Sequence, residues 1–229
     1  MQKQWGFCLG LGVVGIAAIT LLGCGSSKSA VKPMDIASDA GRQAVAQFDT
    51  NKDGVLDYDE LAKAPGLRAA VAKIKKLGTF RGAAPSESQL KSAKIGAEEI
   101  DARIQEWKAH GTGRIAVACR VFRVHKKGDP GMPQPVVGAV VKFVPEGFLG
   151  PGLTVGTGTT DKQGVASISQ PSRGGDDPAE DMSSGFYRVE ITKGSEIPAK
   201  YNTATVLGEE VAFDALNLGK GPLKFELEY

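Results

Sequence analysis

The chain has 229 residues, of which 41% are hydrophobic and 24% charged, and its formal net charge is +2 at pH 7. This composition is typical of a globular protein that is long enough for one large domain or two small ones. The near balance of charge excludes the strongly basic surface of a nucleic-acid-binding protein, so we expect no nucleic-acid partner.

The first 23 residues have the features of an export signal. Lys3 precedes an apolar run over residues 5–23, which ends at Cys24. A positive charge followed by a short apolar stretch is typical of a signal peptide, which predicts residues 1–23 as the signal. Residues 21–24, Leu-Leu-Gly-Cys, resemble a bacterial lipobox, in which the cysteine is lipidated and becomes the mature N-terminus. The alternatives are a retained transmembrane helix, for which the run is short, and an ordinary cleaved signal.

The lipobox resemblance implies that Cys24 anchors the protein to a membrane and that residues 24–35 form a flexible tether. Because no Asp follows Cys24, the anchor is similar to those of lipoproteins sent to an outer membrane. With Cys8 removed and Cys24 lipidated, Cys119 has no intramolecular partner, which excludes a disulfide framework. Cys119 lies in an alternating apolar pattern, so we interpret it as a small core residue rather than a reactive thiol.

Residues 49–60, DTNKDGVLDYDE, hold the strongest chemical signal in the chain. Their oxygen-bearing groups have the spacing of a loop that binds Ca²⁺. Gly54 permits the sharp turn that such a loop requires, and Glu60 can close the site with both carboxylate oxygens. The candidate ligands of one calcium ion are Asp49, Asn51, Asp53, Val55 through its backbone carbonyl, Asp57 through a water molecule, and Glu60.

This segment resembles an EF-hand, with an entering helix predicted over residues 36–48 and a leaving helix over residues 58–64, ended by Pro65 and Gly66. The alternatives are a surface turn that binds nothing and a dockerin-type loop. A turn requires only one or two of these residues, whereas the calcium loop requires the distant Glu60 as well. Glu60 and the preceding helix also argue against a dockerin, whose loops usually end in Asp.

A second helix-loop-helix unit is expected, because a single hand leaves its apolar face exposed. Amphipathic patterns over residues 67–77 and 100–107 predict two further helices. Aligning Ile95 with Leu56 and Glu99 with Glu60 gives the positions of the loop between them. The remaining ligand positions are then Ser88, Leu90 and Ser92, with Ala93 in place of the glycine. We therefore predict a degenerate hand that binds no calcium and places Ile95 beside Leu56 in a two-stranded contact.

After residues 111–113, apolar and polar residues alternate. The pattern predicts half-buried strands over residues 115–121, 187–191 and 223–229, and further strands over 137–144, 154–160 and 165–168. Several short strands separated by Pro and Gly turns favour a β-sandwich of about a hundred residues. The predicted fold is a multidomain α plus β chain, with a helical EF-hand pair over residues 36–110 and an antiparallel β-sandwich over 114–229.

Three segments of this second half follow one another in a recognisable order: GAVVKF at 138–143, TDKQGVA at 160–166 and GFYRVEI at 185–191. They resemble the strand, turn and strand motifs of the transthyretin-like, or carboxypeptidase regulatory-like, domain. The resemblance implies a β-sandwich fold and does not import peptidase activity.

No catalytic constellation is recognisable, and we expect a protein that is not an enzyme. His110 and His125 stand alone at the ends of predicted elements, without the spacing of metal ligands. An acidic cluster comprises Asp176, Asp177, Glu180 and Asp181. We interpret it as a solvated loop rather than as a second cation site. We therefore predict a calcium-binding protein of the cell envelope, whose helical domain is ordered by calcium. The alternative is a module whose β-sandwich binds an envelope protein or a glycan while calcium is only structural.

Overall fold

The structure is a computed structural model that describes residues 35–77, 85–110, 114–124, 132–171, 181–214 and 221–228. The chain after Val31 forms one compact unit. Within the described ranges, no helix is long and apolar enough to cross a membrane. The predicted signal peptide, Cys24, His125, the boundary at 111–113 and most of the acidic cluster lie outside the described residues.

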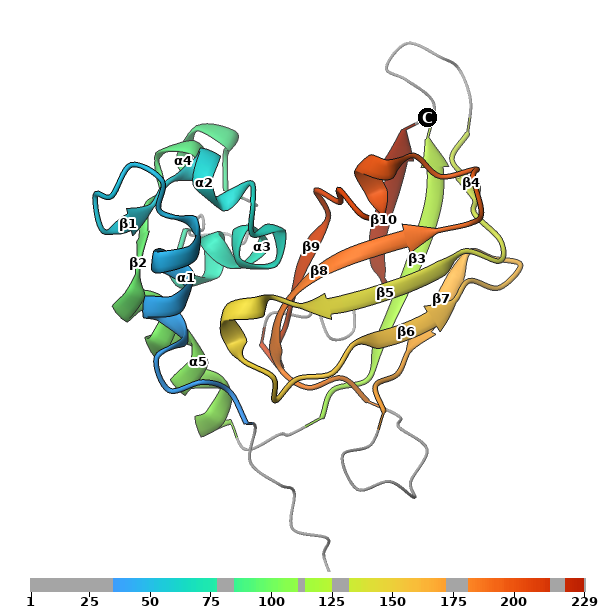
Figure 1. Cartoon of the computed structure of the whole chain (residues 1–229). Coiled ribbons are helices and arrows are strands. Elements are labelled where there is room, and N and C mark those ends of the chain that lie inside the picture. The colour runs from blue at the N-terminus through green and yellow to red at the C-terminus, as the bar shows by residue number, and fades with distance from the viewer. Residues whose placement is uncertain are drawn as a thin grey trace, which may run out of the picture. The chain divides into compact units, whose positions relative to one another are not determined.

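The first part of the described chain is helical (Figure 1). It contains α1 (Ala40–Phe48), β1 (Val55–Leu56), α2 (Tyr58–Leu61), α3 (Pro65–Ile74), α4 (Glu87–Ser92), β2 (Ile95–Gly96) and α5 (Ala97–Ala109). Strands β1 and β2 pair antiparallel with Leu56 opposite Ile95, which confirms the predicted two-stranded contact. Both side chains are fully buried, so the pair joins the two helix-loop-helix segments through apolar contact.

Two helix boundaries differ from the prediction. Helix α2 ends at Leu61, and Pro65 begins α3 rather than only ending the helix before it. Proline is tolerated in the first turn of a helix, because the N–H that it lacks has no partner within the helix there. The predicted helix over residues 67–77 is therefore present, and it begins with the two residues that were expected to be a break.

The predicted degenerate loop is a helix in part. Ser88, Leu90 and Ser92 lie on α4, and only Ala93 follows it. A capping box begins α4, since Ser86 Oγ accepts the Gln89 N–H at 3.3 Å and Gln89 Oε1 accepts the Ser86 N–H at 2.8 Å. The expected loop conformation of residues 88–92 was wrong, because the prediction gave no weight to this local helix-start signal.

The rest of the described chain forms two four-stranded sheets. One contains β3 (Val117–Val124), β4 (Gln134–Pro135), β7 (Val165–Ile168) and β10 (Leu223–Glu228), and the other has the order β6 (Gly156–Thr159), β5 (Val140–Pro145), β8 (Gly185–Thr192), β9 (Gly208–Val211). Short 3₁₀ helices follow β5 at Gly147–Leu149 and precede β9 at Ala199–Tyr201. Strand β10 runs parallel to β3, whereas an antiparallel sandwich was predicted. Alternation indicates which face of a strand is buried, but it does not encode the direction of its neighbour.

Side chains of both sheets form one hydrophobic core. Phe143 of β5 and Phe225 of β10 meet edge to face, with 6.2 Å between ring centroids. Cys119 is fully buried in this core, and burial raises the pKa of its thiol to about 12. The interpretation of Cys119 as a core residue is therefore confirmed. The transthyretin-like assignment of these sheets stays a prediction.

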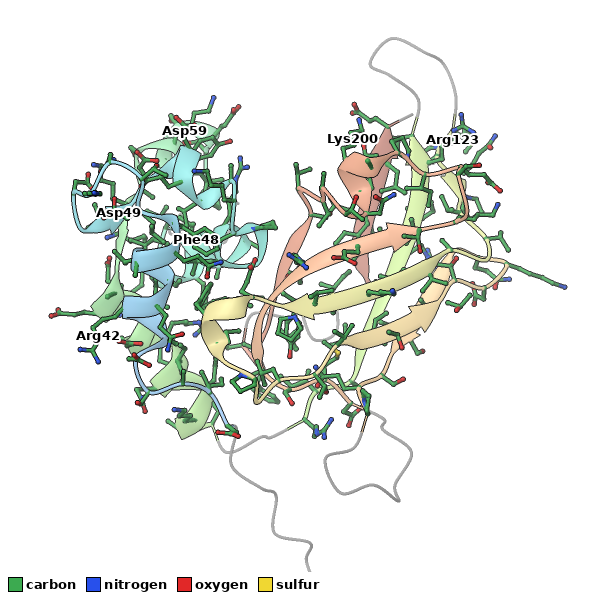
Figure 2. All side chains as sticks on the ribbon, viewed as in Figure 1. Arg42, Phe48, Asp49, Asp59, Arg123 and Lys200 are labelled. Carbon is green, nitrogen blue, oxygen red and sulfur yellow. The ribbon has the colours of Figure 1, made fainter. Side chains whose placement is uncertain are left out.

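A second core joins the helices to the second sheet. The Trp107 ring of α5 lies 4.5 Å from that of Phe186 on β8, measured between centroids. Figure 2 labels Phe48 at the end of α1. Its ring centroid lies 6.2 Å from that of Phe148, in the 3₁₀ helix after β5. The helices therefore bury apolar side chains against the sheet part, and the division into two domains stays a prediction.

Helix α3 packs closely on β8 and β9 because two glycines let the backbones touch. A Cβ atom at Gly66 would lie 2.5 Å from the backbone nitrogen of Tyr187, and one at Gly208 would lie 2.0 Å from the carbonyl carbon of Pro65. Glu146, at the end of β5, accepts the Gly66 N–H at 2.9 Å. Its carboxylate thus satisfies one of the N–H groups that have no partner within the first turn of α3.

Glu146 makes the stability of this packing depend on pH. Burial raises its pKa from 4.5 to about 7, against the opposing effects of the Gly66 N–H and Arg188. Burial also raises the pKa of Glu209 to about 7. Between pH 4.5 and 7 the unfolded chain loses these protons and the folded chain keeps them, so the free energy of unfolding falls as pH rises. For Glu146 alone we expect a loss of about 3 kcal/mol between pH 4.5 and 8.

Urea unfolding at about pH 5 and pH 8 in the presence of a chelator measures this loss. Glu146→Gln keeps an acceptor for the Gly66 N–H but cannot ionise, so its free energy of unfolding should fall less than that of the wild type over the same range, and the fall that remains comes from Glu209. The exposed Glu196 provides the control, and Glu196→Gln should retain the full pH dependence. Equal pH dependence in the wild type and Glu146→Gln would contradict the prediction.

Candidate metal site

The predicted calcium loop connects α1 to α2, and Figure 2 labels Asp49 within it and Asp59 on α2. Asp49 accepts two backbone N–H groups, from Lys52 at 2.6 Å and from Gly54 at 2.9 Å. Gly54 has φ of 83° and Lys52 has φ of 62°, so the chain turns sharply where the glycine was expected. Asn51 and Asp53 each accept an N–H from two residues further on, which folds the rest of the loop tightly.

Glu60 closes the loop from the far end. It has 4% exposure, and its Oε1 accepts the N–H groups of Thr50 at 2.7 Å and Asn51 at 3.2 Å. Its Oε2 accepts the Asp57 N–H at 3.0 Å, while Asp57 Oδ1 accepts the Glu60 N–H at 3.0 Å, so the two residues form a capping box. The N–H of Asp57, followed by those of Thr50 and Asn51, lowers the pKa of Glu60 to about 2 despite burial. Glu60 is therefore ionised and held at the start of the loop.

The donors of this loop fit calcium by their chemistry. Four carboxylates, one amide oxygen and one backbone carbonyl are hard oxygen donors of the kind that Ca²⁺ prefers. The carboxylate oxygens accept N–H groups of the loop, and no three or more described His, Cys, Asp or Glu side chains converge as a metal site. Binding would therefore require the carboxylates of this loop to come closer together than they are in this structure.

Lys94 is a charged neighbour of the loop that the sequence analysis missed. It lies directly before β2, and its Nζ is 2.7 Å from Asp53 Oδ2. The Lys94 ammonium lowers the pKa of Asp53, and the Val55 N–H adds to this effect. A signal was present, because the predicted pairing of Leu56 with Ile95, which is antiparallel, brings Lys94 opposite Asp57 of the candidate loop.

The second helix-loop-helix segment repeats one feature of the first. Glu99 Oε2 accepts the Gly96 N–H at 3.1 Å, as Glu60 Oε2 accepts the Asp57 N–H at 3.0 Å. The other oxygen of Glu99 pairs with Lys75 at 2.7 Å instead of accepting loop N–H groups. The alignment of Glu99 with Glu60 therefore has a structural counterpart, although Ser88, Leu90 and Ser92 stand at the positions aligned with Asp49, Asn51 and Asp53.

A pocket of about 440 Å³ lies beside α2. Its walls come from α2, α3, the region of α4, β9 and β10, and include Tyr58, Leu61, Arg68, Leu90, Glu209 and Phe225. The Arg68 guanidinium donates to the Tyr58 hydroxyl and lies 4.3 Å over the Tyr58 ring. Tyr58 and Leu61 lie on the same short helix as Glu60, so the pocket and the loop share α2.

No protein-family model, curated protein or solved structure matches the chain. The candidate site is accordingly defined by its own residues and their geometry.

Proposed function

We propose that the protein is a non-enzymatic protein of the cell envelope, anchored through lipidated Cys24, that binds one calcium ion in the loop over residues 49–60. One observation carries the proposal: the loop has oxygen donors at the sequence spacing of all six calcium positions, it turns at a positive-φ Gly54, and Glu60 accepts the N–H groups of Thr50 and Asn51 at its start. The resemblance to an EF-hand and the pairing of Leu56 with Ile95 support it. The lipobox supports the anchor.

In this proposal calcium acts by ordering α2 and the packing that depends on it. Leu61 follows Glu60, has 1% exposure and belongs to the same core as Phe148 and Phe186 of the sheet part. Helix α3 begins shortly afterwards and donates the Gly66 N–H to Glu146. A cation that holds the loop and α2 in place therefore also stabilises the contact between the helices and the sheet.

Calcium titration of the soluble fragment that begins at Ser26 tests the proposal, since this fragment contains the whole compact unit after Val31. Isothermal calorimetry should show one site with a Kd of about 10⁻⁴ to 10⁻³ M, the range of exported calcium modules. At about 10 mM calcium such a site adds roughly 1.4 to 2.7 kcal/mol to the free energy of unfolding, which raises Tm by roughly 3 to 10 °C. Two sites would contradict the degenerate second hand, and no heat at millimolar calcium would reject the calcium site.

The pocket beside α2 favours a second candidate function, a module that binds an envelope protein or a glycan while calcium is only structural. Its lining combines apolar side chains with Arg68 and Glu209, which is typical of a binding pocket. A pull-down from envelope extract with the fragment from Ser26, once in calcium and once in chelator, separates the candidates. A partner held equally with and without calcium would favour the second.

A further inference from the structure

Both oxygens of Asp53 have partners in the structure. Asp53 Oδ1 accepts the Val55 N–H at 3.1 Å, and Asp53 Oδ2 pairs with Lys94 Nζ at 2.7 Å. Lys94 comes from the other helix-loop-helix segment, directly before β2, so the β1–β2 pairing holds it near the loop. Each carboxylate oxygen has two lone pairs, so a cation can share Oδ1 with the Val55 N–H, but at either oxygen it lies close to the Lys94 ammonium.

We propose that Lys94 is a built-in competitor of calcium, whose ammonium group occupies Asp53 in the calcium-free protein and is displaced when the ion binds. This inference rests on the proposed calcium site. A carboxylate oxygen in contact with an ammonium group is a poor ligand for a second cation, because the two positive charges repel each other at short range. Lys94 thus weakens calcium binding and neutralises part of the self-repulsion among the loop carboxylates when calcium is absent.

The competition sets an affinity that suits a calcium-rich exterior. Four carboxylates attract a divalent cation strongly, and ligand charge is one of the features that tune affinity in loops of this kind. The Lys94 ammonium beside Asp53 makes the net charge of the loop less negative, which weakens its attraction for the calcium ion. The pair is partly exposed, at 54% for the Lys94 side chain and 36% for that of Asp53, so solvent and salt moderate the effect. We expect Lys94 to weaken binding by about three- to tenfold at low ionic strength.

Lys94→Gln tests the inference, and Lys91→Gln is its matched control. Lys91 lies on the neighbouring α4, is 55% exposed, and pairs with Glu87 at 2.7 Å instead of with a loop carboxylate. The two substitutions remove the same charge from the same segment. Calcium affinity is measured by calorimetry on the fragment from Ser26 at about 20 mM and about 1 M KCl, with a thermal melt in chelator to show that each variant is folded.

Lys94→Gln should lower the calcium Kd by about three- to tenfold at low salt, and the gain should shrink at high salt as the charges are screened. Lys91→Gln should leave Kd within about twofold of the wild type, because its charge is already paired away from the loop. Equal Kd values for the wild type and Lys94→Gln, or equal gains in both variants, would overturn the inference while leaving the calcium site intact. If only Lys94→Gln binds calcium, the competition is complete and the inference holds. Absence of binding in all three proteins would overturn the calcium site, and the inference with it.

Discussion

Glu60→Gln is expected to weaken calcium binding by at least about 100-fold, since even residues that only support metal ligands are worth 10- to 100-fold in affinity. Glu60 is the one predicted ligand that can bind calcium through both oxygens, and glutamine offers a single neutral oxygen instead. Glutamine also places an NH₂ group where an oxygen now accepts a loop N–H, from Thr50 and Asn51 or from Asp57. The calcium-free protein should therefore melt at a lower temperature. Calorimetry measures the calcium affinity, and a thermal melt in chelator measures the decrease in melting temperature.

Asp59→Asn is the matched control for Glu60→Gln. Asp59 is adjacent in sequence and exposed, and it is not a predicted ligand. Its substitution removes the same charge from α2, so the affinity should change by less than about threefold in ordinary salt. An affinity of Glu60→Gln equal to that of the wild type would reject the ligand assignment. Equal losses in both variants would indicate general electrostatic attraction rather than coordination.

Arg103→Met is expected to reduce the free energy of unfolding by about 3 to 5 kcal/mol, the usual cost of removing one partner of a buried ion pair. Arg103 of α5 has 3% exposure, and its Nε lies 2.6 Å from Oε1 of Glu210 on β9. Trp107 Nε1 donates to the same Glu210 oxygen at 3.0 Å. The guanidinium also reaches Asp214 at 2.6 and 3.0 Å. Methionine fills similar space but leaves the Glu210 carboxylate buried without its cation, and urea unfolding near pH 8 measures the cost.

Two further variants separate loss of the ion pair from loss of packing. The double variant Arg103→Met with Glu210→Leu removes both buried charges, and should recover much of the lost stability because a buried pair is often replaceable by apolar residues. Lys73→Met breaks a more exposed pair with the same Asp214, where Nζ and Oδ2 are 3.1 Å apart, and should cost less than about 1 kcal/mol. If Arg103→Met costs no more than Lys73→Met, the buried pair does not hold α5 to β9.

The geometry of the candidate loop was largely predictable because it is local. Asp49, Gly54 and Glu60 lie within one short segment. Their residue types indicate that Gly54 turns the chain and that Glu60 closes the loop. The structure places Gly54 at positive φ and Glu60 against the start of the loop, as these types require. The contact of Leu56 with Ile95 was predictable for a related reason, since aligning the two segments pairs their central apolar residues.

The contacts between helices and sheet were not predictable from periodicity. Gly66 with Glu146, and Arg103 with Glu210, join residues that lie 80 and 107 positions apart. Amphipathic patterns show that α3 and α5 bury one face, but not which strands cover it. Buried Glu146 and Glu210 also contradict the simple expectation that carboxylates lie in water, and only their N–H and guanidinium partners explain their burial.

By itself, therefore, the sequence determined the position and donors of the candidate calcium loop, the Leu56–Ile95 pairing and the buried faces of the main strands. These features follow from spacings of a few residues, where chain connectivity leaves little freedom. The tertiary structure alone decided that β10 lies parallel to β3 and that the Glu146 carboxylate accepts the Gly66 N–H in the first turn of α3. These features depend on which segments, far apart in the sequence, pack together and exclude water from the contact. The order of neighbouring residues does not encode this pairing.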